Sequence, residues 1–371
     1  MKILWLTLIF INLSVVIAGE ERALGKSPRG LLIGDAFTAL ADDEYSLFYN
    51  PALLGRHSGF TFHPFNPTVT GTNVLSDQSR FEDLGDDPGD IADAMLGFPI
   101  HVGANFAPGF KMGNFGLVAL MNSQSNLNLQ NKVSPTLDVD FRNDRGFIAG
   151  FGAPIQGSYT QLGGGTQLSL GVSVKYIDRE SINGAYYLLG TTLMDAVGAE
   201  DPTQILNELG KVRGQGWGFD LGVDYIKSNG GTTFSAGLAF LDVVTNLQTE
   251  DNENDYEVQS QPMQVNFGTS YAQKLGEAIG YTLSVDIKRL SENVEFMRRV
   301  HLGGEVNLTP ALSVLAGMNA LDNYSYGLKL NMGLVKAYAG FYGVETGESL
   351  GQEDSDRFLV YLSLFEFNFM P

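Results

Sequence analysis

Residues 217–225 read Trp-Gly-Phe-Asp-Leu-Gly-Val-Asp-Tyr. Every second residue is aromatic or aliphatic, and the residues between them are glycine or aspartate. Successive side chains of a β-strand point to opposite faces, so this stretch predicts a strand with one apolar and one polar face. A strand of this kind can turn its apolar face to lipid and its polar face to the interior of a barrel.

Four other stretches repeat the alternation, at 167–176, 281–288, 299–308 and 324–331. An antiparallel sandwich would also show one polar and one buried face, so the pattern alone does not separate the two folds. Further evidence must come from the connections between the strands.

The connections between about fourteen strand-like segments alternate between short and long. Short ones lie near residue 113 and at 157–165, 228–231, 273–278, 309–310 and 333, and long ones at 70–98, 125–137, 179–213, 246–258 and 346–354. In an up-and-down barrel, odd and even connections emerge at opposite ends. We therefore predict an all-β fold in which residues 57–371 form a 14-stranded antiparallel transmembrane β-barrel. Its long loops would be extracellular and both chain termini periplasmic, in a bacterial outer membrane.

The amino terminus resembles a secretory signal peptide. Met1-Lys2 precedes an apolar run from Ile3 to Ile17, and Ala18 offers a small residue for cleavage. We predict that residues 1–18 are removed. A membrane-anchoring helix is the alternative, but a run of this length that contains Asn12 and Ser14 is shorter than a typical span.

Composition excludes several classes of function. The formal net charge is −19, which argues against a nucleic-acid partner bound through a basic patch. The chain has no cysteine, so it has neither disulfides nor thiolate metal sites. Acidic clusters in the long loops lack the spacing of a twelve-residue calcium loop, and we predict no metal and no cofactor.

The polar strand faces carry charges of both signs, including Asp286, Lys288, Arg299 and Glu305. Buried charges are costly unless they are paired, so we expect these four to pair across strands. The four histidines accompany no hydrolase or nucleotide-binding motif. We therefore predict that the protein is not an enzyme, with a hydrolase built on His301 as a minor alternative.

The carboxyl terminus forms a further amphipathic strand. Leu359, Tyr361, Phe365, Phe367 and Phe369 share one face, and the sequence given ends two residues later. A terminal strand of this kind resembles the segment that the outer-membrane assembly machinery recognises, so we expect that machinery to be a partner. Pairing with the first strand would remove an exposed hydrophobic edge.

Residues 19–56 are too apolar for a free tail and are expected to fold inside the barrel as a hatch segment. Asn50-Pro51 is a turn signal, because an Asn side chain can bond the backbone two residues on. We predict an inner ligand pocket from one group of hatch residues: Phe37, Leu40, Tyr45, Leu47, Phe48, Asn50, Pro51 and Ala52. Simple packing of the hatch explains the same residues equally well.

The stretches 39–43, Ala-Leu-Ala-Asp-Asp, and 48–52, Phe-Tyr-Asn-Pro-Ala, resemble the hatch signature of the FadL-type outer-membrane transporters. The PorV-like relatives in that superfamily, one of which serves protein secretion, carry the same signature, and residues 301–305 look closer to them. The match covers about thirty residues. It departs from the family at Asp35, where a small residue is usual, and at Leu53, where glycine is common.

This resemblance implies fourteen strands, a hatch, and passive uptake of long-chain fatty acids or other hydrophobic compounds. Ligand would be captured on outer loops beside lipopolysaccharide and would leave sideways into lipid. We assign capture to Tyr186, Tyr187, Leu188 and Leu189, which are also suited to packing as a lid.

A lateral opening requires a broken strand ladder, and Pro108 with Gly109 is the best candidate, ahead of Pro154. We expect a bulge at Pro108, although the proline could also simply begin the turn at Gly113.

Three functional hypotheses remain. Transport predicts an apolar tunnel beside the hatch and an opening in the wall. A PorV-like accessory role, with a secretion-system partner, predicts a sealed lumen. A general porin predicts continuous water through the middle.

Overall fold

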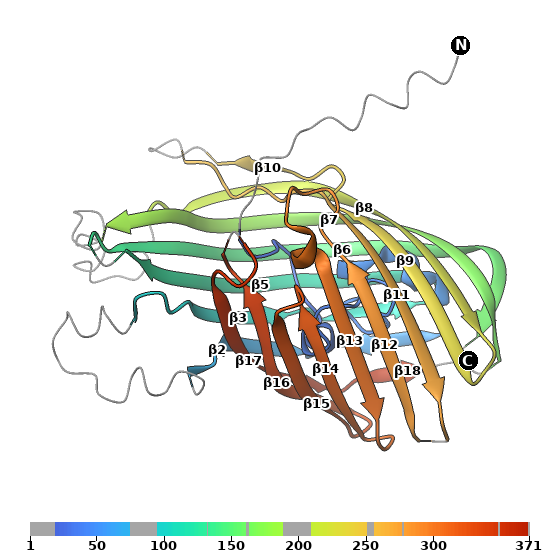
Figure 1. Ribbon diagram of the computed structural model, residues 1–371. Helices are drawn as coiled ribbons and strands as arrows, with labels where there is room; N and C mark the ends of the chain where they lie inside the picture. The colour runs from blue at the N-terminus through green and yellow to red at the C-terminus, as the bar shows by residue number, and fades with distance from the viewer. Residues whose placement is uncertain are drawn as a thin grey trace, which may run out of the picture.

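The computed structural model describes residues 19–74, 95–131, 133–160, 163–187, 209–250, 256–276, 278–347 and 349–369. Its strands form one antiparallel sheet that curls on itself and closes where β17 (Asp354–Leu364) pairs with β2 (Pro67–Thr72) (Figure 1). The signal peptide predicted at residues 1–18 lies outside the described residues.

Within the described residues, four short helices and the remaining strands complete the fold. The helices are α1 (Pro28–Leu32), α2 (Ser46–Tyr49), η1 (Pro51–Arg56) and η3 (Phe296–Arg299). The strands of the first half are β1 (Phe60–His63), β3 (Ile100–Phe106), β4 (Gly109–Met112), β5 (Phe115–Gln130), β6 (Thr136–Thr160), β7 (Gly164–Tyr187), β8 (Val212–Ser228) and β9 (Thr232–Leu241). The strands of the second half are β10 (Asn246–Thr249), β11 (Gln264–Lys274), β12 (Gly280–Ile287), β13 (Val300–Asn307), β14 (Leu312–Asn319), β15 (Asn323–Asn331), β16 (Val335–Glu345) and β18 (Phe367–Phe369).

Fourteen strands make the closed ring, namely β2, β3, β5 to β9 and β11 to β17. The short strands β1, β4 and β18 pair with one another in a row that continues β2, β3 and β17 toward one end of the barrel. The predicted all-β, 14-stranded antiparallel barrel is therefore confirmed. Closure leaves no free edge in the ring, which an isolated sheet of this length would expose.

The wall has the polarity that the alternation predicts. On β8, Trp217, Phe219 and Leu221 face outward and are about half exposed, at 47–52%. Asp220 and Asp224 on the same strand face inward and are buried. The outer surface is thus apolar and suited to lipid. Among the described residues, no helix combines the length and the apolar character needed to cross a membrane.

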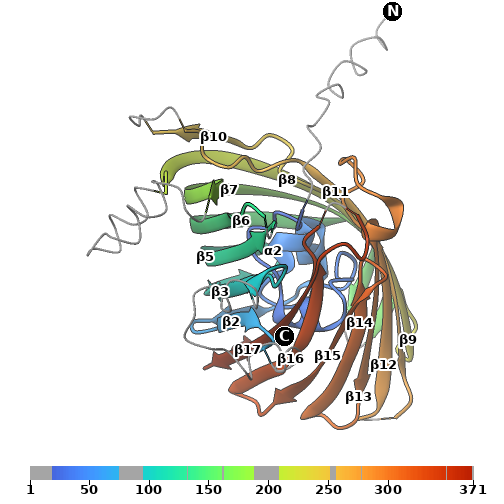
Figure 2. The same cartoon turned by 60° about the vertical axis from the view of Figure 1, so that its left-hand side comes forward.

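The hatch segment, residues 19–56, lies inside the ring of strands, where Figure 2 shows it in blue. Its charged side chains pair with the wall: Arg29 Nε is 2.6 Å from Glu305 Oε2, and Asp35 Oδ2 is 2.6 Å from Lys288 Nζ. The expected pairs of Asp286 and Lys288 with Arg299 and Glu305 are therefore wrong. Glu305 does pair across strands, but with Lys329 of β15 at 3.1 Å, and Arg299 donates to the carbonyls of Glu292 and Val294. Asp286 accepts hydrogen bonds from two hatch amides, those of Phe37 (2.9 Å) and Thr38 (2.7 Å).

Asp35, which departs from the family signature, has a structural role here. Its backbone φ is 61°, a left-handed conformation that aspartate tolerates better than most residues. Its carboxylate also accepts a hydrogen bond of 2.6 Å from the Tyr49 hydroxyl. An aspartate at this position thus joins a tight turn of the hatch to the positively charged Lys288 of the wall.

The Asn50-Pro51-Ala52 motif docks the hatch against β7 and β8. Asn50 Oδ1 accepts from the Ala52 amide at 3.0 Å, and Asn50 Nδ2 donates to the Val223 carbonyl at 3.1 Å. A Cβ atom at Gly171 would overlap the Ala52 nitrogen, and one at Gly222 would overlap Asn50 Oδ1. Glycine on the inner wall therefore permits the close approach of the hatch backbone.

The two ends of the described chain lie at opposite ends of the barrel. We name the end with the turns at residues 113–114 and 229–231 the short-turn end, and the opposite one the long-loop end. Phe369 pairs with Phe60 at the short-turn end. The Gly19 carbonyl, in contrast, accepts from Arg289 and Arg298 in the β12–β13 connection, at the long-loop end. Residues 19 and 369 therefore lie at opposite ends of the barrel, and the periplasmic placement of the two termini stays a prediction.

Replacing Arg56 by methionine should strongly destabilise the barrel. Arg56 makes a two-point ion pair with Asp224, which is fully buried, so the substitution leaves a buried carboxylate without its counter-charge. Loss of one partner from a buried pair costs about 3 to 5 kcal/mol. Urea unfolding of the barrel in lipid vesicles measures this loss in the free energy of unfolding. The same change at Arg213, an exposed partner of Asp178, should have little effect, and an equal loss in both variants would contradict the argument.

Candidate functional site

The first candidate site is a seam in the barrel wall. The pairing of β1 and β2 with β4 and β3 is interrupted at residues 64–66 on one side and 107–108 on the other, whereas Phe65 still bridges to Leu364 of β17. Pro67 pairs with Phe106, and His63 pairs with Gly109, so three residues on one strand face two on the other. This count defines a β-bulge.

The extra residue does not lie at Pro108, where the sequence placed it. Along β5, Phe106 faces Met121 and Gly109 faces Val118, so the register continues unchanged past the proline. The Pro108 carbonyl also accepts from the Ala119 amide at 2.8 Å. The irregularity therefore belongs to the segment 64–66 of the neighbouring strand. We name this discontinuity, 64–66 opposite 107–108, the seam.

One side chain closes the seam. Asn66 is fully buried; its Nδ2 donates to the Ala107 carbonyl at 2.8 Å, and its Oδ1 accepts from the Ala107 amide at 3.1 Å. The Asn66 amide thus takes the place of the missing backbone partner. Pro64 and Pro108 carry no N–H, so the seam contains fewer donors that need a partner in lipid.

The outer side of the seam is hollowed into an apolar groove of about 580 Å³. Its walls come from β1, β4, β5 and β6: Phe62, Pro64, Pro108, Gly109, Phe110, Leu117, Ala119 and Phe147. Both lateral-opening candidates, Pro108 and Gly109, therefore line this groove. Asn66 was not predicted from the sequence, although Pro64 and Pro67 close to it mark an irregular strand.

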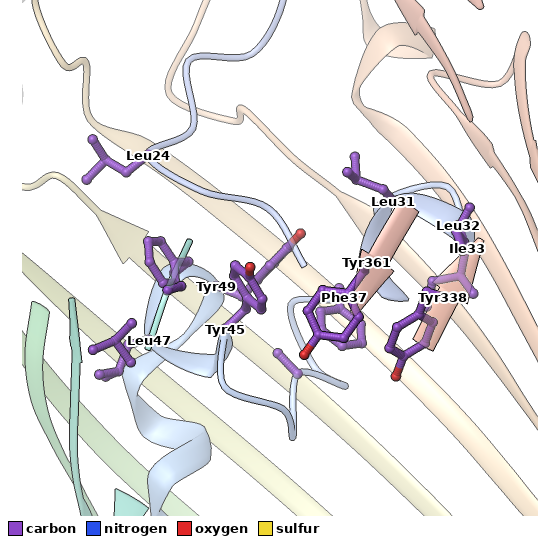
Figure 3. Packing of buried hydrophobic residues seen from close by; sticks show 14 of the residues in the cluster. Leu24, Leu31, Leu32, Ile33, Phe37, Tyr45, Leu47, Tyr49, Tyr338 and Tyr361 are labelled. Atoms are coloured by element: carbon purple, nitrogen blue, oxygen red, sulfur yellow. The ribbon is translucent and has the colours of Figure 1, made fainter. Parts of the chain in front are cut away.

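The second candidate site is the predicted hatch pocket. Phe37, Tyr45 and Leu47 are fully buried, Phe48 is nearly so, and Leu40 packs against the same cluster. Figure 3 shows hatch residues Phe37, Tyr45 and Tyr49 beside Tyr338 and Tyr361 of the wall. Phe37 and Tyr49 meet edge to face at 5.1 Å. These side chains fill the space around one another, and their role in ligand binding remains a prediction.

The motif residues Asn50, Pro51 and Ala52 are likewise buried and hold the hatch against the wall. Phe48 does border a cavity, but that cavity has a volume of only about 20 Å³ and includes Lys175, Asp242 and Lys288 in its lining. A ligand-sized apolar pocket would need space that the hatch core now occupies.

Two more cavities lie beside the first residues of the hatch. An inner cavity of about 60 Å³ is bordered by Lys26, His101 and Asn122. A vestibule of about 390 Å³ opens at the long-loop end, between Pro99, Asn128 and Asp140. The side chains of Glu20 and Arg357 border both spaces.

Inward-facing residues on the long-loop half of β5 are all uncharged amides, namely Asn122, Gln124, Asn126, Asn128 and Gln130. The first two border the inner cavity, and the last three border the vestibule. Amides donate and accept hydrogen bonds without charge. They therefore form a continuous polar surface from the long-loop end to the middle of the lumen.

The predicted capture loop is only partly described. Tyr186 and Tyr187 end β7. The Tyr186 hydroxyl donates to the Leu209 carbonyl, and Tyr187 is exposed. Leu188 and Leu189 lie outside the described residues. Capture by this loop remains a prediction.

The pKa values of two hatch carboxyl groups are shifted far from their ordinary values. Burial and the nearby charge of Glu44 raise the pKa of Asp43 to about 7. Burial opposes ionisation of Glu20 as well, but the adjacent Arg357 guanidinium holds the pKa of Glu20 at about 2. At neutral pH Glu20 is therefore a carboxylate, whereas Asp43 is partly protonated.

No family model matches the chain, and no curated protein matches it. Solved structures do match. The TodX monoaromatic hydrocarbon channel, as its deltaS2 mutant, is 12% identical over 94% of this chain and 100% of that chain, with a TM-score of 0.51. The chain has the fold of a FadL-type outer-membrane barrel.

Two further matches have lower TM-scores. The CymD monoaromatic hydrocarbon channel is 10% identical over 94% of this chain and 99% of that chain, with a TM-score of 0.49. The toluene transporter TodX of Pseudomonas putida is 11% identical over 93% and 98%, with a TM-score of 0.45. These proteins are named as channels and a transporter. At such low identity the FadL-type likeness concerns the fold alone.

Replacing Asn66 by alanine should loosen the seam. The substitution leaves the buried Ala107 amide and carbonyl without partners, and each unpaired group costs about 1 to 3 kcal/mol. Hydrogen exchange followed by mass spectrometry should show at least about tenfold faster exchange at residues 104–111, since about 1.4 kcal/mol corresponds to tenfold. Asn331→Ala, in a short turn at Gly333, is the control. Unchanged exchange at 104–111 would show that Asn66 does not close the seam.

The titration of Asp43 should make the hatch less stable as pH rises. Its pKa in the folded state, about 7, lies above the ordinary value of 3.8. The protonated carboxyl therefore contributes stability that is complete below about pH 4 and is lost as the pH rises through about 7. Asp43→Asn keeps this side chain neutral at every pH, so the variant should lose the pH-dependent component. Urea unfolding of both proteins between acidic and mildly basic pH measures it, and parallel pH profiles would refute the assignment.

Proposed function

We propose that this barrel lies in the outer membrane and conducts hydrophobic compounds passively, with lateral exit through the seam. The observation that carries the proposal is the coincidence of a broken strand ladder with an apolar groove on the lipid-facing side of the wall. A compound that leaves at this point enters lipid directly. It therefore does not have to cross the polar headgroup layer.

The position of the hatch behind the seam supports the same route. Lys111 of β4 donates to the carbonyls of Asp42 (2.6 Å) and Asp43 (3.0 Å). Tyr45 donates to Asn105 of β3 at 2.8 Å. The hatch is thus attached to the two strands on either side of Pro108. Movement of residues 42–45 would break these hydrogen bonds between the hatch and the strands on either side of the seam.

The groove suits apolar cargo, because its lining consists of aromatic, aliphatic, proline and glycine residues. TodX is named as a monoaromatic hydrocarbon channel, which favours compounds of this class. Long-chain fatty acids fit the same groove chemistry. In this proposal the long loops face the cell exterior and contact lipopolysaccharide, and the short turns face the periplasm.

A second function is favoured by the interior. The cavities next to the hatch core are small and bordered by charged residues, and the hatch is tied to the wall by ion pairs such as Arg29–Glu305 and Arg56–Asp224. A filled lumen suits a PorV-like accessory barrel, in which the surface rather than the interior would bind a secretion-system partner. Under this alternative, the groove would hold lipid and no cargo would cross.

Filling the groove distinguishes the two functions. Ala119→Trp places a large ring among the lining residues of the groove, whereas Ala339→Trp places the same ring on the outer face of β16, away from the seam. We expect Ala119→Trp to reduce uptake of labelled toluene and labelled oleate several-fold and Ala339→Trp to leave it unchanged. Uptake is measured in cells that lack other hydrophobic channels and express the protein.

Equal uptake by wild type and Ala119→Trp would place the exit elsewhere. If cells that express the wild-type barrel take up no more labelled compound than cells without it, transport is refuted and the accessory role remains.

A further inference from the structure

A run of three acidic residues lies in the part of the hatch behind the seam. Residues 42–44 read Asp-Asp-Glu. The Asp42 carboxylate is paired, with its Oδ1 2.6 Å from Arg29 Nη1, and the Glu44 carboxylate accepts from the Tyr361 hydroxyl. Asp43 differs from both, because its carboxyl group forms no ion pair with any arginine, lysine or histidine among the described residues.

The partly buried carboxyl group of Asp43 has only neutral partners. Its Oδ2 is 2.5 Å from Ser27 Oγ, and its Oδ1 accepts from the Tyr45 amide at 2.9 Å. When it is protonated, this group can donate to Ser27 Oγ and keep both contacts without a charge. When it is ionised, it becomes a carboxylate inside the lumen without a paired cation, which is an unfavourable state.

The charged groups that face Asp43 do not compensate its charge. From the hatch these groups are Asp42, Glu44, Arg29 and the Tyr45 hydroxyl, and from the wall they are Lys111 of β4 with Lys336 and Tyr338 of β16. Arg29 and Lys336 are each paired with another carboxylate. The Lys111 ammonium donates to two backbone carbonyls, those of Asp42 and Asp43. Each cation therefore already has a partner, and the two adjacent carboxylates repel a third negative charge.

The same segment is bonded to both strands that border the seam. We name residues 42–45 the latch. Lys111, which holds its carbonyls, belongs to β4 on one side of Pro108, and the Tyr45 hydroxyl donates to Asn105 of β3 on the other side at 2.8 Å. An ionised Asp43 would either attract the Lys111 ammonium away from the carbonyls or turn toward water. Both changes break the contact of the latch with β4.

We propose that the latch is a pH-responsive closure of the seam, held by protonated Asp43 and released when Asp43 ionises. This inference rests on the proposed function and names its regulation. In acid, the neutral carboxyl group leaves the latch bonded to β3 and β4, and the wall stays shut. Above neutral pH, the carboxylate loosens residues 42–45, and the inner side of the seam becomes accessible from the lumen.

The acidity of Asp43 is consistent with a switch near neutral pH. Burial and the charge of Glu44 raise the pKa of Asp43 to about 7, from an ordinary value of 3.8. The closed latch therefore binds a proton more tightly than a carboxyl group in water does, so acid favours closure, and closure is lost as the pH rises through about 7. Between about pH 6 and about pH 8, a group with this pKa changes the closing equilibrium about tenfold.

Hydrogen exchange of the purified full-length barrel, in detergent at about pH 6 and about pH 8, tests the latch. The quantity compared is the protection factor, which cancels the pH dependence of the intrinsic exchange rate. Protection of wild type at residues 42–48 and 104–111 should fall about tenfold from the lower to the higher pH. Asp43→Asn should keep the acidic level of protection at both pH values, because its amide is neutral throughout.

Two further variants make the test decisive. Asp42→Asn changes the adjacent acid, whose carboxylate is paired with Arg29 and 68% exposed, and it should retain the fall in protection. Lys111→Met removes the bonds between the latch and β4, so protection should be low at both pH values. If Asp43→Asn does not fold, Lys111→Met decides the matter, since a tenfold response that survives in it would refute the latch.

Uptake connects the latch with transport. Uptake of labelled toluene by cells that express the barrel is measured relative to cells without it. From about pH 6 to about pH 8 it should rise several-fold for wild type and for Asp42→Asn. It should stay at the acidic level for Asp43→Asn.

The two measurements separate the latch from the proposed function. Equal protection of wild type at both pH values, or a response that persists in Asp43→Asn, overturns the latch and leaves hydrophobic transport intact. A pH-dependent latch in a barrel that brings no labelled toluene into cells at either pH refutes the proposed function alone.

Discussion

The structure depends on the neutralisation of charges that a closed barrel turns inward. Alternation along each strand sends every second side chain into the lumen, where an unpaired charge is expensive. Asp224, Lys288, Glu305 and Arg357 all obtain counter-charges from the hatch. The hatch is therefore a structural part of the barrel wall as much as a plug, and the two should fold as one unit.

Backbone hydrogen bonding imposes the second constraint. In lipid, an unpaired amide or carbonyl has no water to replace its partner, so a bulged strand must satisfy its groups internally. At the seam this is achieved by Asn66, which pairs with both backbone groups of Ala107, and by prolines that have no N–H to satisfy. A ladder held by one side chain is easier to open than a continuous one. The proposed lateral route would therefore open at the seam.

A filled lumen and a transport function are compatible if only a small part of the hatch moves. The segment that carries α1, α2 and η1 is held by ion pairs, aromatic packing and the Asn50 turn. Residues 19–27 lack regular structure, and the Glu20–Arg357 pair sits between two cavities.

The sequence by itself determined the fold of the barrel wall. A period of two along the strands, with Trp217 and Phe219 on one face and Asp220 on the other, and the alternation of short and long connections are local patterns, so the fourteen-stranded barrel followed from them. The turn at Asn50-Pro51 is local chemistry of the same kind, and the assignment of residues 19–56 as a hatch stays a prediction.

Tertiary structure alone decided which residues meet across the lumen. Glu20 and Arg357 are 337 positions apart, and Asn66 reaches Ala107 on the next strand only because a bulge turns it there. The partners of Asp286 and Lys288 proved to be hatch groups rather than neighbouring strands for the same reason. The period of two along a strand predicts which face a side chain occupies. Its partner is set by the curvature of the closed sheet and by the path of the chain inside it, and neither is encoded in a local pattern.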